Sequence, residues 1–195
     1  GAMFAAFPNW YATLFSGFYL ALFLMLVALI FRAVAFEYRS KDKSARWRNA
    51  WDWALFAGSA IPALLWGVAM SNIVRGVPID ADMNYVGGFF NLLNPYALLG
   101  GLAGLAVFTL QGALLLSIRT TDEVRERAEA LAKRLWPVVL IVGAATVVAS
   151  YFATDIFQRL GVNPGISAIG AGAAFLVGGW LITQRRFGWA FIMNS

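Results

Sequence analysis

Residues 10–36 read WYATLFSGFYLALFLMLVALIFRAVAF, and this stretch decides the fold class. It holds a single charged side chain, Arg32, near its far end. A helix needs roughly 20 consecutive apolar residues to cross the hydrocarbon core of a bilayer. The apolar residues follow one another without the alternation expected of a membrane β-strand. The stretch therefore predicts a transmembrane helix.

Polar clusters divide the rest of the chain into four further apolar runs of similar length. The sequence thus predicts an all-α fold, a polytopic bundle of about five transmembrane helices, with partial helices at both ends of the chain. We expect one membrane domain over residues 1–195. The expected spans are 10–36, 51–73, 95–118, 135–157 and 166–183, joined by loops 37–50 and 119–134 on one side and by an ordered loop, 74–93, on the other.

The composition agrees with a membrane protein. Of the 195 residues, 61% are hydrophobic and 13% are charged. A soluble domain carries about twice that fraction of charged residues. A core that fits inside this chain cannot hide so much apolar surface, so the surplus must face lipid or a partner protein.

The basic residues indicate the topology. Of the 15 lysines and arginines, thirteen fall on one side of the expected bundle, and only Arg75 and Arg159 fall on the other. Lysine and arginine accumulate in cytoplasmic loops, so the loops 37–50 and 119–134 are predicted to be cytoplasmic. The net charge of +5 then reflects topology and does not indicate a nucleic-acid partner.

The residue types that are absent exclude several chemistries. The chain has no cysteine and no histidine, which excludes disulfides and thiolates and removes the commonest ligand of haem, copper and zinc. The five methionines are expected to pack rather than to ligate. No glycine-rich phosphate loop with a following lysine is present, so nothing supports nucleotide-driven transport. We therefore expect no metal site and no redox centre in this chain.

Two charges at the end of the first span stand out, because charges inside a membrane are costly. Arg32 lies about one turn inside the first span, and Asp52 lies at the start of the next, antiparallel span. One hypothesis is that they pair as a polar anchor at an interface beside a partner's cofactor. The alternative is that Arg32 extends to the lipid headgroups and Asp52 caps its helix.

Weaker candidates have mostly structural interpretations. Glu37 could take part in proton uptake, although a carboxylate at this depth is more often solvated. Gln111 lies in the middle of the third span, where an amide usually hydrogen-bonds to a neighbouring helix. The charges of segment 120–133 indicate a short cytoplasmic helix. Small residues predict close helix packing in the third and fifth spans, at Gly100, Gly101, Gly104, Gly170, Gly172, Gly178 and Gly179.

Several strings, in order, resemble subunit II of the cytochrome bd quinol oxidases. The resemblance covers residues 1 to about 120 and extends more loosely to residues 189–191. It rests on Gly1–Pro8, Phe15–Tyr19, Arg32–Arg39, Trp51–Trp53, Gly76–Pro78, Asn91–Tyr96 and Gly100–Gly101.

The resemblance implies a haem-free subunit in the bacterial plasma membrane that supports a haem-bearing subunit I. That partner would carry haems b and d, oxidise ubiquinol or menaquinol and reduce oxygen to water. The family subunit is longer, with eight helices in two four-helix units, and this chain looks like its middle. The resemblance further implies a small accessory subunit, a structural quinone or lipid, and a role for Arg32 and Asp52 in the haem-bearing assembly. The competing hypotheses are a transporter or channel subunit that uses Arg32, and a membrane scaffold without redox partners.

Overall fold

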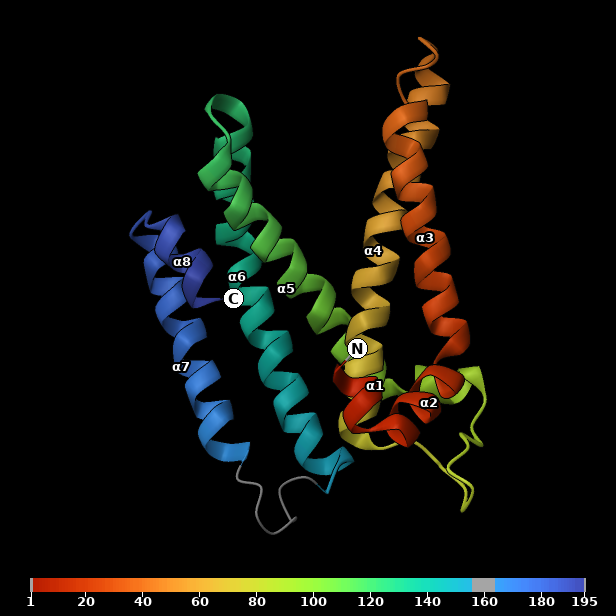
Figure 1. Ribbon diagram of the computed structural model, residues 1–195. Coiled ribbons are helices and arrows are strands. Elements are labelled where there is room, and N and C mark those ends of the chain that lie inside the picture. The colour runs from red at the N-terminus through yellow and green to blue at the C-terminus, as the bar shows by residue number, and fades with distance from the viewer. Residues whose placement is uncertain (1, 156–163, 195) are drawn as a thin grey trace. The chain divides into compact units, whose positions relative to one another are not determined.

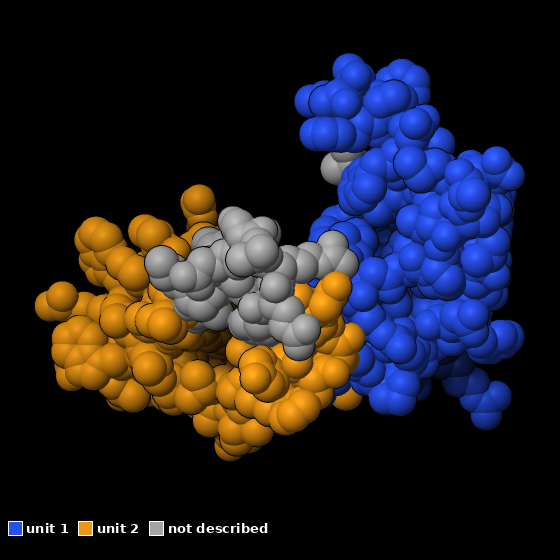
Figure 2. Space-filling view, turned by 90° about the horizontal axis from the view of Figure 1, so that it is seen from below, with its two compact units in different colours: residues 1–101 blue, residues 102–195 orange. Residues whose placement is uncertain are grey.

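The computed structural model of the chain describes residues 2–155 and 164–194. Throughout this part the regular elements are helices, and the one β-type pairing is an isolated bridge between Ile79 and Tyr85. The all-α prediction is confirmed. The chain divides into two compact units, residues 1–101 and 102–195, which Figure 2 colours separately. The expectation of a single membrane domain stays a prediction.

The first unit is built on a long helical hairpin. Helices α3 and α4 run side by side in opposite directions (Figure 1), joined by a short turn after Tyr38. Gly58 permits their close approach, since a Cβ atom there would lie 2.7 Å from the carbonyl oxygen of Ala28 and 2.8 Å from the Cβ of Arg32. The elements of this unit are α1 (Ala2–Ala6), α2 (Pro8–Gly17), α3 (Tyr19–Tyr38), α4 (Ala45–Arg75), η1 (Phe89–Leu93) and the start of α5 (Pro95–Arg119).

The expected span 10–36 is two helices, not one. The chain bends at Phe18, where α2 ends and α3 begins. Phe18 is buried with Ala69 and Leu92, and the bend places it in that cluster. Gly17 makes room for the ring of Tyr85, whose Cγ would lie 2.8 Å from a Cβ at this position. Long-range packing thus interrupts a run that is uniformly apolar in sequence.

The second unit packs four helices around one apolar cluster. Leu110 and Leu114 of α5 contribute its most buried leucines, together with Ile182 of α7. The indole of Trp136 donates to the carbonyl of Phe175 at 3.0 Å and packs on Gly179, where a side chain would collide with the ring. Besides the rest of α5, the helices are α6 (Asp122–Ala153), α7 (Pro164–Thr183) and α8 (Phe187–Met193).

Helix α6 differs from its expected form. The segment 119–134 was expected to be a loop with a short helix of its own, before a span that opens at Trp136 and Pro137. Instead one helix runs from Asp122 through Pro137 to Ala153. A proline removes only one backbone hydrogen bond of its helix, and ion pairs four residues apart support the polar turns before it, Arg127 with Glu123 and Arg125 with Glu129.

Four described helices are long and apolar enough to cross a membrane: α3, α4, α5 and α6. The described apolar part of α7, Ile169–Thr183, is shorter. In α3 the most apolar window has a mean hydropathy of 2.4, yet only 22% of it is buried within the chain. Its large side chains therefore need lipid or a partner protein. The segment 156–163, which includes Arg159 and the expected end of the fourth span, lies outside the described residues.

Candidate functional site

The most defined charged contact joins the two ends of the α3–α4 hairpin. Nε of Arg39 donates to Oδ1 of Asp52 at 2.5 Å, and Nη2 of Arg39 donates to Oδ2 at 3.2 Å. This two-point contact uses the planar fork of the guanidinium. The hydrogen bond to the Asp52 carboxylate, more than its charge, raises the pKa of Arg39 above its ordinary value. Both side chains remain about half exposed, at 48% and 47%.

An aromatic cluster supports the pair from the same end of the hairpin. The Trp47 indole donates to the backbone carbonyl of Tyr38 at 2.8 Å and closes the turn. The ring of Trp51 lies 5.6 Å from that of Tyr38 and 5.7 Å from that of Trp47, centre to centre. Because these contacts fix both sides of the turn, Arg39 and Asp52 are held within reach of each other.

The structure does not bring Arg32 and Asp52 together. Asp52 is paired with Arg39, and Arg32 makes no ion pair within the described part of the chain. The reason is the direction of helical side chains, which tilt toward the N-terminus of their own helix. In this hairpin that tilt moves Arg39 and Asp52 toward each other, whereas it moves Arg32 further from Asp52. Arg32 is left exposed beside Gly58.

The two weaker candidates have ordinary structural contacts. Glu37 is exposed and lies 3.4 Å from the ammonium of Lys41, one turn away. The amide of Gln111 donates to the backbone carbonyl of Phe191 in α8 at 3.4 Å. Gln111 thus links two helices of the second unit, as a mid-span amide is expected to do.

A buried asparagine network was missed by the sequence analysis. Asn72 is 2% exposed, and its amide donates to the carbonyls of Val68 at 2.9 Å and of Leu92 at 2.7 Å. Its own oxygen accepts from the amide of Asn94 at 2.9 Å. Asn94 also caps α5, since its oxygen accepts from the N–H of Ala97 at 3.0 Å. The network ties the end of α4 to the start of α5.

Small residues let α4 approach the start of α5 in the same region. A Cβ atom on Gly67 would collide with the carbonyl oxygen of Gly100 and lie 2.9 Å from the Cα of Gly101. One on Gly100 would collide with the hydroxyl of Ser71. The predicted close packing at Gly100 and Gly101 is therefore confirmed.

The loop between α4 and η1 is ordered, as expected for 74–93. The carboxylate of Asp80 accepts from the N–H groups of Asp82 and Asn84, at 3.0 and 2.7 Å. The hydroxyl of Thr13 donates to the carbonyl of Met83 and so attaches the loop to α2. The phenol of Tyr85 donates to the carbonyl of Gly88 at 3.0 Å, and burial raises its pKa.

Comparison with known proteins identifies the family of this chain. All of residues 1–195 match the family described as cytochrome bd terminal oxidase subunit II. The chain belongs to this family. The resemblance noted in the sequence is confirmed.

Three relatives named as subunit 2 of a cytochrome oxidase are similar to this chain. Cytochrome bd ubiquinol oxidase subunit 2 of Bacillus subtilis is 37% identical over 195 residues, which are 100% of this chain and 58% of the relative. Cytochrome bd-I ubiquinol oxidase subunit 2 of Escherichia coli K12 is 48% identical over 137 residues, 68% of this chain and 36% of the relative. A probable cytochrome oxidase subunit 2 of Haemophilus influenzae is 47% identical over 137 residues, with the same coverage. The matched residues thus cover 58% of the first of these relatives and 36% of the other two.

The sequence lacks the two residue types that most often hold haem iron. Haem iron takes axial ligands such as histidine or cysteine, and the sequence has neither. Met25 on α3 is buried, at 8% exposure. Among the described residues, no three His, Cys, Asp or Glu side chains gather as metal ligands.

Proposed function

We propose that this chain acts as the haem-free subunit II of a cytochrome bd-type terminal oxidase in the bacterial plasma membrane. Haems b and d of a subunit I partner would oxidise quinol and reduce oxygen to water in aerobic respiration, which contributes to the proton motive force. The observation that carries the proposal is the family match over the whole chain in a sequence without histidine or cysteine. Electrons would then stay in the partner.

The role of the subunit would be to hold subunit I in its active form. The outer surface of α3 supports this role, because large exposed side chains such as Phe23, Leu26 and Ile30 need a cover of protein or lipid. We place Arg32, which has no ion-pair partner among the described residues, at such an interface. Asp52 would stabilise the hairpin through its ion pair with Arg39. Cytoplasmic basic loops, a small accessory subunit and a structural quinone or lipid complete the proposal.

The proposal is tested on the purified oxidase, on subunit I alone and on full-length subunit II alone. Haem absorption should follow subunit I in every preparation. Stoichiometric haem in subunit II alone would contradict the proposal. Replacing Arg32 or Asp52 by alanine should lower the haem content or the yield of the complex, whereas Asn49→Ala, an exposed change on α4, should not.

The alternative of a transporter or channel subunit makes a different prediction. If Arg32 serves a transported anion, Arg32→Ala would abolish uptake into vesicles and leave the oxidase activity and haem content unchanged. Arg32 is exposed on α3 and is absent from the lining of four pockets that the described residues form, which favours the interface role.

A further inference from the structure

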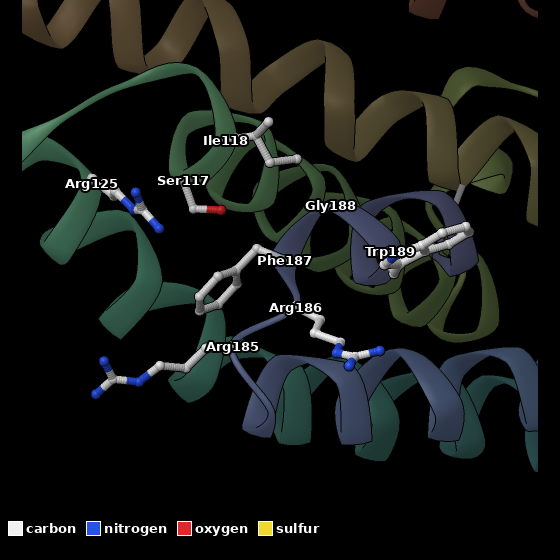
Figure 3. A pocket seen from close by; sticks show the side chains of 8 residues that line it. All are labelled: Ser117, Ile118, Arg125, Arg185, Arg186, Phe187, Gly188 and Trp189. Atoms are coloured by element: carbon white, nitrogen blue, oxygen red, sulfur yellow. The ribbon is translucent and has the colours of Figure 1, made fainter.

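A pocket of about 430 Å³ opens in the second unit where α5 ends, α6 begins and α7 turns into α8. Three arginines from two elements line it, together with the hydroxyl of Ser117. Figure 3 shows Arg125 coming from α6 and Arg185 and Arg186 from the turn before α8, with the side chains of Arg185 and Arg186 extending to opposite sides of Phe187. The pocket is thus a concentration of fixed positive charge at one end of apolar helices.

These charges are only partly neutralised. Arg185 and Arg186 make no ion pair with any described residue, and Arg125 uses its Nε for Glu129 at 2.9 Å, which leaves its terminal N–H groups. No carboxylate belongs to the described lining. Guanidinium groups keep their charge at any physiological pH and match the geometry of a phosphate. The chemistry of the pocket therefore selects an anion with several oxygens.

An apolar groove continues from this pocket. Its volume is about 390 Å³, and it shares Ile118, Gly188 and Trp189 with the basic pocket. Beyond the shared residues its walls are formed by the apolar side chains of Leu115, Phe191 and Ile192 and by one charged residue, Arg119. Trp189 is 59% exposed at the junction of the two, and tryptophan favours the depth of lipid headgroups. A free anion would leave this groove unused, whereas a lipid would fill both parts.

We propose that the two connected cavities bind one anionic phospholipid. Its phosphate lies among Arg125, Arg185 and Arg186, and an acyl chain follows Leu115 and Ile192. This end of the unit is the one that the basic residues predict to be cytoplasmic, where anionic lipids give the membrane surface its negative potential. The inference rests on the proposed function, to whose structural lipid it gives a place and a headgroup charge, and it does not depend on where the haems are held.

The test uses the complete oxidase complex, stripped of lipid in detergent. Bound lipid is counted by native mass spectrometry during titration with phosphatidylglycerol or, in parallel, with zwitterionic phosphatidylcholine. The wild-type complex should bind phosphatidylglycerol at least about tenfold more tightly, as expected for several arginines near the headgroup. Equal binding of the two lipids in the wild type would overturn the proposal without reference to any variant.

Variants then locate the site. The double change Arg185→Gln and Arg186→Gln should weaken phosphatidylglycerol binding about tenfold, while the charge-matched change Arg46→Gln and Arg48→Gln in the first turn of α4 should leave it within about twofold. An equal loss in both double variants would refute the site.

Displacement of the lipid by millimolar inorganic phosphate would mean a site for free anions. An acidic segment of a partner subunit cross-linked to Trp189 would mean a protein contact, and either result would overturn the lipid assignment.

Discussion

Arg39 and Asp52, thirteen residues apart, close the α3–α4 hairpin by two parallel hydrogen bonds, Nε to Oδ1 and Nη2 to Oδ2. The contact belongs to the turn end of the hairpin, where Trp47 and Trp51 also pack. This contact at the turn therefore helps to fix how α3 and α4, both long enough to cross a membrane, are aligned along their length. Since α3 carries Arg32 seven residues earlier, this register also sets where Arg32 is presented.

The pairing predicts which arginine is energetically coupled to Asp52. In a double-mutant cycle, the effects of Arg39→Ala and Asp52→Ala should be non-additive, as expected for the two partners of one ion pair. Arg32→Ala and Asp52→Ala should add without coupling. The free energy of unfolding of the complex in detergent is the quantity to measure. Coupling of Arg32 with Asp52 in place of Arg39 would show that the register described here is wrong.

Buried hydrogen bonding predicts a larger effect at Asn72. Asn72→Leu leaves the carbonyl of Leu92 without this donor and removes one of the two acceptors of the Asn94 amide, and an unsatisfied buried group costs about 1–3 kcal/mol. The variant should lower the melting temperature of the oxidase complex clearly. Asn49→Leu, the same change at an exposed position of the same helix, is the control and should have little effect. Similar melting temperatures for both variants would argue against the network.

Backbone proximity makes Gly67 the most sensitive small residue of α4. A methyl group there meets the backbone of Gly100 and Gly101, which cannot rotate away. Gly67→Ala should therefore destabilise the complex by about 1–3 kcal/mol, as overpacking does. Gly112→Ala meets no atom within 4 Å of the new Cβ and should be neutral or slightly stabilising. Thermal unfolding of both variants distinguishes tight packing from the ordinary abundance of glycine in membrane helices.

The sequence predicted the helices better than their contacts. Apolar runs identified α3, α4 and α5 because lipid demands length and hydrophobicity, and these are visible residue by residue. It did not reveal the bend at Phe18, since only packing against Ala69 and Leu92 distinguishes that residue from its apolar neighbours.

The candidate site shows the same limit. Arg32 and Asp52 were expected to pair from their depth alone, but the tilt of side chains along antiparallel helices favours Arg39. No local sequence pattern indicated the role of Asn72, because its partners Leu92 and Asn94 lie 20 and 22 residues away. The one available signal was an amide in the last turn of an apolar helix, followed by a second amide just before the next one.

The final prediction concerns pH and the loop that packs on α2. Burial raises the pKa of Tyr85 above its ordinary value of 10.0, because the charged phenolate is disfavoured there. The neutral ring therefore contributes stability that is complete below pH 10 and is lost as the pH rises through the raised native pKa.

Tyr85→Phe loses the hydrogen bond to Gly88, about 0.5–1.5 kcal/mol, yet removes this titration. The stability of the wild-type complex should thus fall more steeply above pH 10 than that of Tyr85→Phe, so that the difference between them shrinks. Parallel slopes for wild type and Tyr85→Phe would show that the phenol ionises as freely in the folded loop as in the unfolded chain.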